Sequence, residues 1–169
     1  MAHIGFSNNP KDRTDKNSPE KVRAEITFYD ENNQKIFGAI QGRWGQTDQP
    51  THIRREETRK IESIDFPNHG AVRYVDLFMK YPEDDYCYGY NNESYDFANY
   101  QNPAFVIPLK RFFVVVKLFG AYLPDKEWTF EAETNGRGDT FKIRKIGDKW
   151  QKKENSVSTI KKTPLLKKP

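Results

Sequence analysis

Cysteine is almost absent from this sequence, since Cys87 is the only one among 169 residues. One cysteine excludes an intramolecular disulfide and a zinc site made of several cysteines. His3, His52 and His69 are scattered and lack the spacing of metal ligands, so we expect no metal site. No apolar run approaches the roughly 18 residues of a membrane helix, and no basic and then apolar leader is present. These features predict a soluble, cytoplasmic protein, with a soluble portion of a membrane-anchored protein as the alternative.

Catalytic signatures are also lacking. The sequence contains no G-x-S-x-G, Walker A, G-x-G-x-x-G or C-x-x-C motif. Cys87 has no base near it in the sequence, so we interpret it as a structural thiol. Because no nucleophile, base and orienting group can be assembled, we expect no enzymatic activity and no cofactor.

Charge is small overall but uneven along the chain. The net charge is +4, and residues 149–169 hold seven lysines and one glutamate, so the remainder is slightly acidic. This basic tail lacks hydrophobic periodicity and is predicted to be disordered. It also lacks aromatic residues after Trp150 for base stacking, which argues against specific nucleic-acid binding. Weak contact with anionic membranes or nucleic acid through the lysines is the remaining expectation for the tail.

What is present in the rest of the chain is alternation with period two. Val22, Ala24, Ile26 and Phe28, for example, alternate with more polar residues, as in a half-buried strand. Strands separated by turns predict an all-β, antiparallel sandwich of seven or eight strands. It would form one domain over residues 1–148, followed by the tail. The expected strands cover residues 2–6, 22–29, 36–44, 61–66, 72–81, 111–119, 127–133 and 140–146.

The pattern of these strands resembles a known family. Trp44 falls on the third strand, where an immunoglobulin-like sandwich has its core tryptophan. Together with the segments given below, it makes residues 2–146 similar to an immunoglobulin-like domain of unknown function found in prokaryotic proteins, some of them membrane-anchored. The resemblance implies a sandwich scaffold and no activity. The segments are residues 22–29, Gly42-Arg43-Trp44 with Gln49-Pro50, residues 80–85, 88–95, 113–120 and 128–130.

Residues 81–105 form the most unusual segment, because they hold six of the nine tyrosines and many amide side chains. Tyrosine and amides are typical of recognition surfaces. Period two would place Tyr86, Tyr88 and Tyr90 on one side, and we expect at least two rings of these and Tyr95 to be exposed. The alternative is that the rings pin the loop onto the sandwich. The candidate binding surface consists of Tyr86, Tyr88, Tyr90, Asn91, Asn92 and Tyr95.

The sequence therefore favours a non-enzymatic interaction or accessory module. Its partner would be a protein or a glycan, and its oligomeric state stays open. A carbohydrate-binding module that uses the same tyrosines is the alternative, and an uncharacterised enzyme is the third hypothesis. Glu83, Asp84 and Asp85 do not have the spacing of a calcium loop and are interpreted as a solvated acidic turn.

Overall fold

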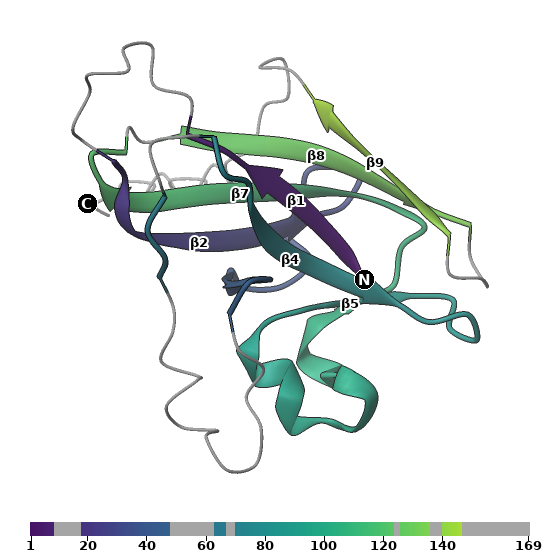
Figure 1. Ribbon diagram of the computed structural model, residues 1–169. Coiled ribbons are helices and arrows are strands. Elements are labelled where there is room, and N and C mark those ends of the chain that lie inside the picture. The colour runs from purple at the N-terminus through teal and green to yellow at the C-terminus, as the bar shows by residue number, and fades with distance from the viewer. Residues whose placement is uncertain (9–17, 48–62, 67–69, 124–125, 136–139, 147–169) are drawn as a thin grey trace, which may run out of the picture.

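The protein is an antiparallel β structure in the computed structural model, which describes residues 1–8, 18–47, 63–66, 70–123, 126–135 and 140–146 (Figure 1). Three short 3-10 helices, η1 to η3, lie between β5 and β6. The all-β class predicted from the sequence is confirmed. The strands are β1 (Ala2–Phe6), β2 (Glu20–Tyr29), β3 (Ile40–Trp44), β4 (Arg73–Lys80), β5 (Cys87–Gly89), β6 (Val106–Ile107), β7 (Arg111–Ala121), β8 (Lys126–Thr134) and β9 (Phe141–Ile146).

One nine-stranded sheet contains all of these strands, in the order β6-β5-β4-β3-β2-β7-β8-β9, with β1 paired to β4. The division into two hydrogen-bonded sheets that a sandwich would have is not seen, because β3 pairs with both β2 and β4. The alternation expected for β2 is present, with Val22, Ala24, Ile26 and Phe28 buried in the core. Apolar residues on one face and polar residues on the other hold this strand in register.

Trp44 lies where β3 leaves β2 to join β4. Ala24 of β2 pairs with Gly42, but two residues later Trp44 pairs with Val75 of β4. Gly42 permits this close crossing, because an added Cβ would lie 2.8 Å from the Cβ of Ala24. The Trp44 indole lies at this fork, the point where β2 and β4 diverge, and donates from Nε1 to the Val22 carbonyl at 3.2 Å. The predicted burial of Trp44 is confirmed.

A bulge interrupts β4. His3 of β1 pairs with Asp76 and Ala2 pairs with Phe78, so Leu77 is left without a partner on β1. Simple period-two alternation through the strand expected over residues 72–81 would put Leu77 and Phe78 on opposite faces. That prediction is wrong locally, because the bulge resets the alternation and all four residues from Val75 to Phe78 are buried.

The sheet curls so that β1 and β4 face β7, β8 and β9 across the core. Phe6 of β1 contacts Trp128 of β8, with ring centroids 4.9 Å apart. Phe78 of β4 contacts Phe112 of β7 at 5.2 Å and Phe141 of β9 at 5.4 Å. In Figure 1, β1 and β4 cross in front of β2 and β7. Strands from both ends of the sheet thus share one hydrophobic core.

Other expectations for the strands need correction or fall outside the described residues. The strand expected over residues 36–44 begins only at Ile40, because the chain bends at residues 36 and 37, just after the single Tyr29–Lys35 bridge. Residues 63–66 contribute a single bridge from Ile64 to Val22 rather than a strand. Residues 81–105, expected as a loop, include β5. The basic tail and residues 48–62 lie outside the described part of the chain.

Candidate contact surface

The tyrosine-rich connection is ordered by its own amides. Asn91 caps η1 (Asn92–Asp96), since its Oδ1 accepts from the backbone N–H groups of Glu93 and Ser94 at 3.0 and 3.2 Å. Asn102 does the same before η3 (Pro103–Phe105), where its Oδ1 accepts from the Ala104 N–H at 2.9 Å. Two of the amides that suggested recognition chemistry are therefore occupied in capping short helices.

The first of two tyrosine clusters lies on β5 and the turn before it. The Tyr86 and Tyr88 ring centroids are 5.4 Å apart, and those of Tyr81 and Tyr88 are 6.3 Å apart. The Tyr81 hydroxyl donates to the Asn99 carbonyl. Lys80, which is buried, donates from Nζ to the Tyr81 carbonyl at 2.8 Å and so braces the acidic turn. This cluster fastens the connection to the sheet.

The second cluster consists of Tyr90, Tyr95 and Tyr100, and each of these rings contacts the other two. Their ring centroids are 5.0 to 5.9 Å apart in all three pairs. Burial and a hydrogen bond with Tyr95 raise the pKa of the Tyr90 phenol above its ordinary value, so this hydroxyl stays neutral.

The predicted exposure of the candidate residues is wrong for several of them. Tyr88, Tyr90 and Asn91 are 7%, 2% and 4% exposed. The remaining candidates, Tyr86, Asn92 and Tyr95, are half-buried. The physical reason is that β5 pairs on both sides, with β4 and β6, while the 3-10 helices fold back next to it (Figure 1). The alternative in which rings pin the loop describes Tyr88 and Tyr90 better than a contact surface does.

A buried ion pair, which was not predicted from the sequence, lies next to the second cluster. Arg43 Nη1 is 3.2 Å from Asp76 Oδ2, and both side chains are buried. The Arg43 guanidinium lies over the Tyr95 ring, 5.5 Å from its centroid, and donates to the Trp44 and Thr47 carbonyls at 2.9 and 2.8 Å. The signal that could have revealed this pair was a charged residue in the apolar part of each strand, Arg43 beside Trp44 in β3 and Asp76 between Val75 and Leu77 in β4.

Burial has a clear electrostatic effect on this pair. Desolvation raises the pKa of Asp76 above its ordinary value, and the nearby Arg43 guanidinium offsets that effect only in part. Such a pair costs desolvation energy on both sides, so it is weak evidence for a purely stabilising role.

Beside the ion pair, the outer surface of β1 and β4 carries exposed rings. Tyr74 is 41% exposed, and its ring packs edge-on against His3 with centroids 5.2 Å apart. His3 lies opposite Asp76, and Tyr74 alternates with the core residue Val75, so both rings share the outer face with Arg43 and Asp76. We call His3, Tyr74 and Tyr95, which surround the Arg43–Asp76 pair, the ring face.

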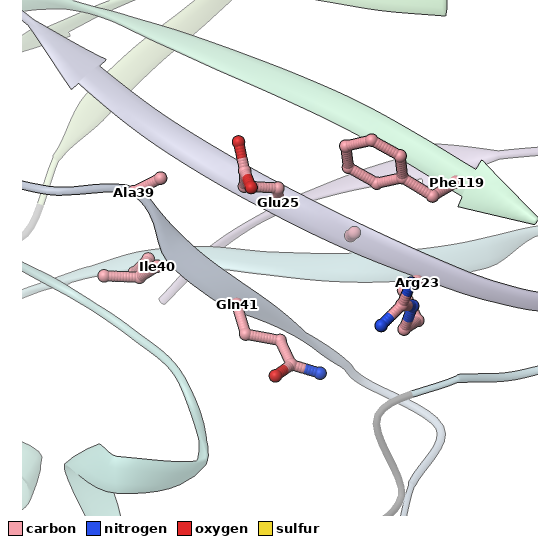
Figure 2. Close-up of a pocket in the computed structure, with 7 residues that line it drawn as sticks. Arg23, Glu25, Ala39, Ile40, Gln41 and Phe119 are labelled. Carbon is pink, nitrogen blue, oxygen red and sulfur yellow. The ribbon is translucent and has the colours of Figure 1, made fainter. Parts of the chain in front are cut away.

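Two grooves elsewhere offer less specific chemistry. Arg23, Glu25, Gln41 and Phe119 line a groove of about 240 Å³ on β2, β3 and β7 (Figure 2). A second one, of about 580 Å³, lies on the outer face of β7, β8 and β9. There Arg111 and Arg144 both donate to the Glu131 carboxylate, which occupies these cations. Neither groove presents a nucleophile or a metal-ligand set.

The described part of the chain forms no candidate metal centre, and its one cysteine is buried. No group of three or more histidine, cysteine, aspartate or glutamate residues is placed to hold a metal ion there. Cys87 is buried in the core, and burial raises the pKa of its thiol to about 12, as suits a structural thiol. None of the described helices has the length and apolar character needed to cross a membrane.

Comparisons with family models, with curated proteins and with solved structures find no match to this chain. The similarity to immunoglobulin-like domains therefore stays a prediction from the strand pattern.

Proposed function

We propose that this protein is a non-enzymatic interaction module that binds a protein partner through the ring face. The observation that carries the proposal is the exposed Tyr74–His3 ring pair beside the buried Arg43–Asp76 ion pair. Aromatic rings and arginine dominate the binding energy of protein interfaces.

The surroundings of these rings support a protein partner over a sugar. Sugars bind to open aromatic faces, but the Tyr95 ring is already covered by Arg43 and flanked by Tyr90 and Tyr100. The Tyr74 ring is exposed in part and packs edge-on against His3, which suits the centre of a protein interface with a polar neighbour.

Site-specific photocrosslinking tests the proposal. Tyr74 would be replaced by a photoreactive phenylalanine derivative, and a matched variant would carry it at Tyr122, which is more exposed at 63%. We expect one defined crosslinked partner from position 74 and none from position 122. Equal labelling at both positions would show that exposure alone causes the contact.

A binding measurement then separates the ring face from the fold. Tyr74→Ala should weaken binding of the identified partner by about tenfold or more, with an unchanged melting temperature, because the ring is exposed. Tyr122→Ala, the control, should leave binding unchanged. A glycan array on which the wild type binds and Tyr74→Ala does not would replace the protein partner by a carbohydrate.

A further inference from the structure

Three described strands, β1, β6 and β9, pair with another strand on one side only, and β1 and β9 are the two longer ones. Among the described residues, β1 pairs with β4 and no other strand, and β9 pairs with β8 and no other strand. Every pairing along the path β1-β4-β3-β2-β7-β8-β9 is antiparallel, so β1 and β9 run in the same direction. Each keeps one edge of backbone N–H and C=O groups without a strand beside it in the described part of the chain.

The curl of the sheet brings these two edges to the same side of the core. Ala2 pairs with Phe78, whose ring contacts Phe141, so β1 and β9 begin at the same end. At the other end, the ring of Phe6 contacts Trp128 of β8. Trp128 precedes Thr129, which pairs with Ile146, the last residue of β9. We call the interval between β1 and β9, bounded by these two ring contacts, the seam.

Apolar side chains line the seam without full burial. Ile4 of β1, with Phe141 and Ile143 of β9, packs against the core yet stays half-buried. The inward residues of the central strands, such as Ile26 and Val116, have no exposed surface at all. The core is therefore less completely covered along the seam than at its centre.

The two strands that border the seam carry basic and no acidic side chains, although Arg144 of β9 already pairs with Glu131 of β8. Strand β9 carries Lys142, Arg144 and Lys145 and no acidic residue, while β1 carries neither acidic residues nor lysine or arginine. A second copy of β9 would bring the same cations together, and residues 149–169 add further lysines. Like charges on neighbouring strands oppose pairing. This argues against a second copy of β9 and against residues 149–169 as the segment that fills the seam, and it favours an acidic segment.

We propose that the seam binds an extended segment of a partner protein in which apolar residues alternate with acidic ones. The segment would run antiparallel to both β1 and β9 and complete their hydrogen bonding, as in β-strand addition. Its apolar side chains would cover Ile4 and Ile143, and one of its carboxylates would face outward beside Lys142. This site is separate from the ring face and does not depend on it.

A model peptide tests the proposal directly. The probe is a fluorescent octapeptide of alternating valine and glutamate with blocked ends, titrated against the full chain by fluorescence anisotropy. A peptide with lysine in place of glutamate and one with all valines before all glutamates are the controls. We expect saturable binding of the alternating acidic peptide, at least about tenfold tighter than either control.

Two further measurements locate the binding. Hydrogen exchange should show new protection of backbone amides in β1 and β9 and little change elsewhere. Lys142→Glu should weaken the peptide several-fold, whereas Lys35→Glu should not. Lys35 is a matched control, because it makes the same charge change between β2 and β3, strands that pair with neither β1 nor β9.

Three outcomes would overturn the proposal. The first is no binding of the acidic peptide to the full chain, and the second is binding without protection of β1 and β9. The third is binding that emerges only after deletion of residues 149–169, which would make the chain's own tail the occupant. None of these outcomes bears on crosslinking at Tyr74.

Discussion

Replacement of Trp44 tests the packing at the fork between β2 and β4. The indole is fully buried, contacts the Phe66 ring edge-on at 5.5 Å and donates to the Val22 carbonyl at 3.2 Å. Trp44→Ala removes this whole side chain from a site whose neighbours lie on several strands. Substitutions of buried aromatic residues by alanine cost about 3–5 kcal/mol of unfolding free energy, and we expect that range here.

Trp44→Phe separates the contribution of the indole hydrogen bond from that of the buried apolar surface. The hydrogen bond contributes about 0.5–1.5 kcal/mol, at the lower end here because the Val22 carbonyl also accepts from the Ile64 N–H at 3.0 Å. The smaller apolar surface of phenylalanine adds about 1 kcal/mol. We therefore expect a loss of about 1.5 kcal/mol for Trp44→Phe, clearly less than for Trp44→Ala.

Urea unfolding followed by far-UV circular dichroism measures both variants. For Trp44→Ala the midpoint should fall by more than about 1 M, with little change in the slope. Trp128→Ala is the matched control, because Trp128 is a half-buried tryptophan and should cost less. A midpoint for Trp44→Ala that hardly moves, or that moves no further than for Trp128→Ala, would refute the placement of Trp44 at the centre of the core.

Three further predictions concern other parts of the molecule. Hydrogen bonds from Arg144 and Arg111 lower the pKa of Glu131. The ionised Glu131 therefore stabilises the fold at neutral pH, and this stabilisation is lost as the pH falls through the lowered pKa. The melting temperature of Glu131→Gln should be lower than that of the wild type at neutral pH and should change less than the wild-type value when the pH is lowered. The Cys87 thiol, with its pKa raised to about 12, should react with a disulfide reagent at mildly alkaline pH only after unfolding, and rapid reaction in the native state would contradict its burial. Deletion of residues 151–169 should leave the melting temperature nearly unchanged and abolish any salt-sensitive retention on anionic vesicles; a large loss of thermal stability would show that the tail docks.

The candidate site was predicted from the sequence only in part. The tyrosine-rich segment was recognised from its composition, but the positions of its rings depend on how β5 and the 3-10 helices fold. Tyr88 and Tyr90 became buried because strands and helices cover them, a long-range effect that period two cannot express. The Arg43–Asp76 pair was missed because its members are 33 positions apart and meet only when β3 pairs with β4.

Local chemistry was enough to determine several features from the sequence alone. Alternating residues in β2 and β7 specify half-buried strands, because a strand presents successive side chains to opposite faces. Trp44 was expected in the core from its place on the third strand, and Cys87 was interpreted as a structural thiol because no base lies near it in the sequence; both side chains are buried. Tertiary structure alone decided that β3 passes from β2 to β4, that β4 bulges at Leu77, and that the edge strands β1 and β9 lie on the same side of the core. These features depend on which distant strands pair, and pairing is set by the packing of the whole core rather than by any one segment.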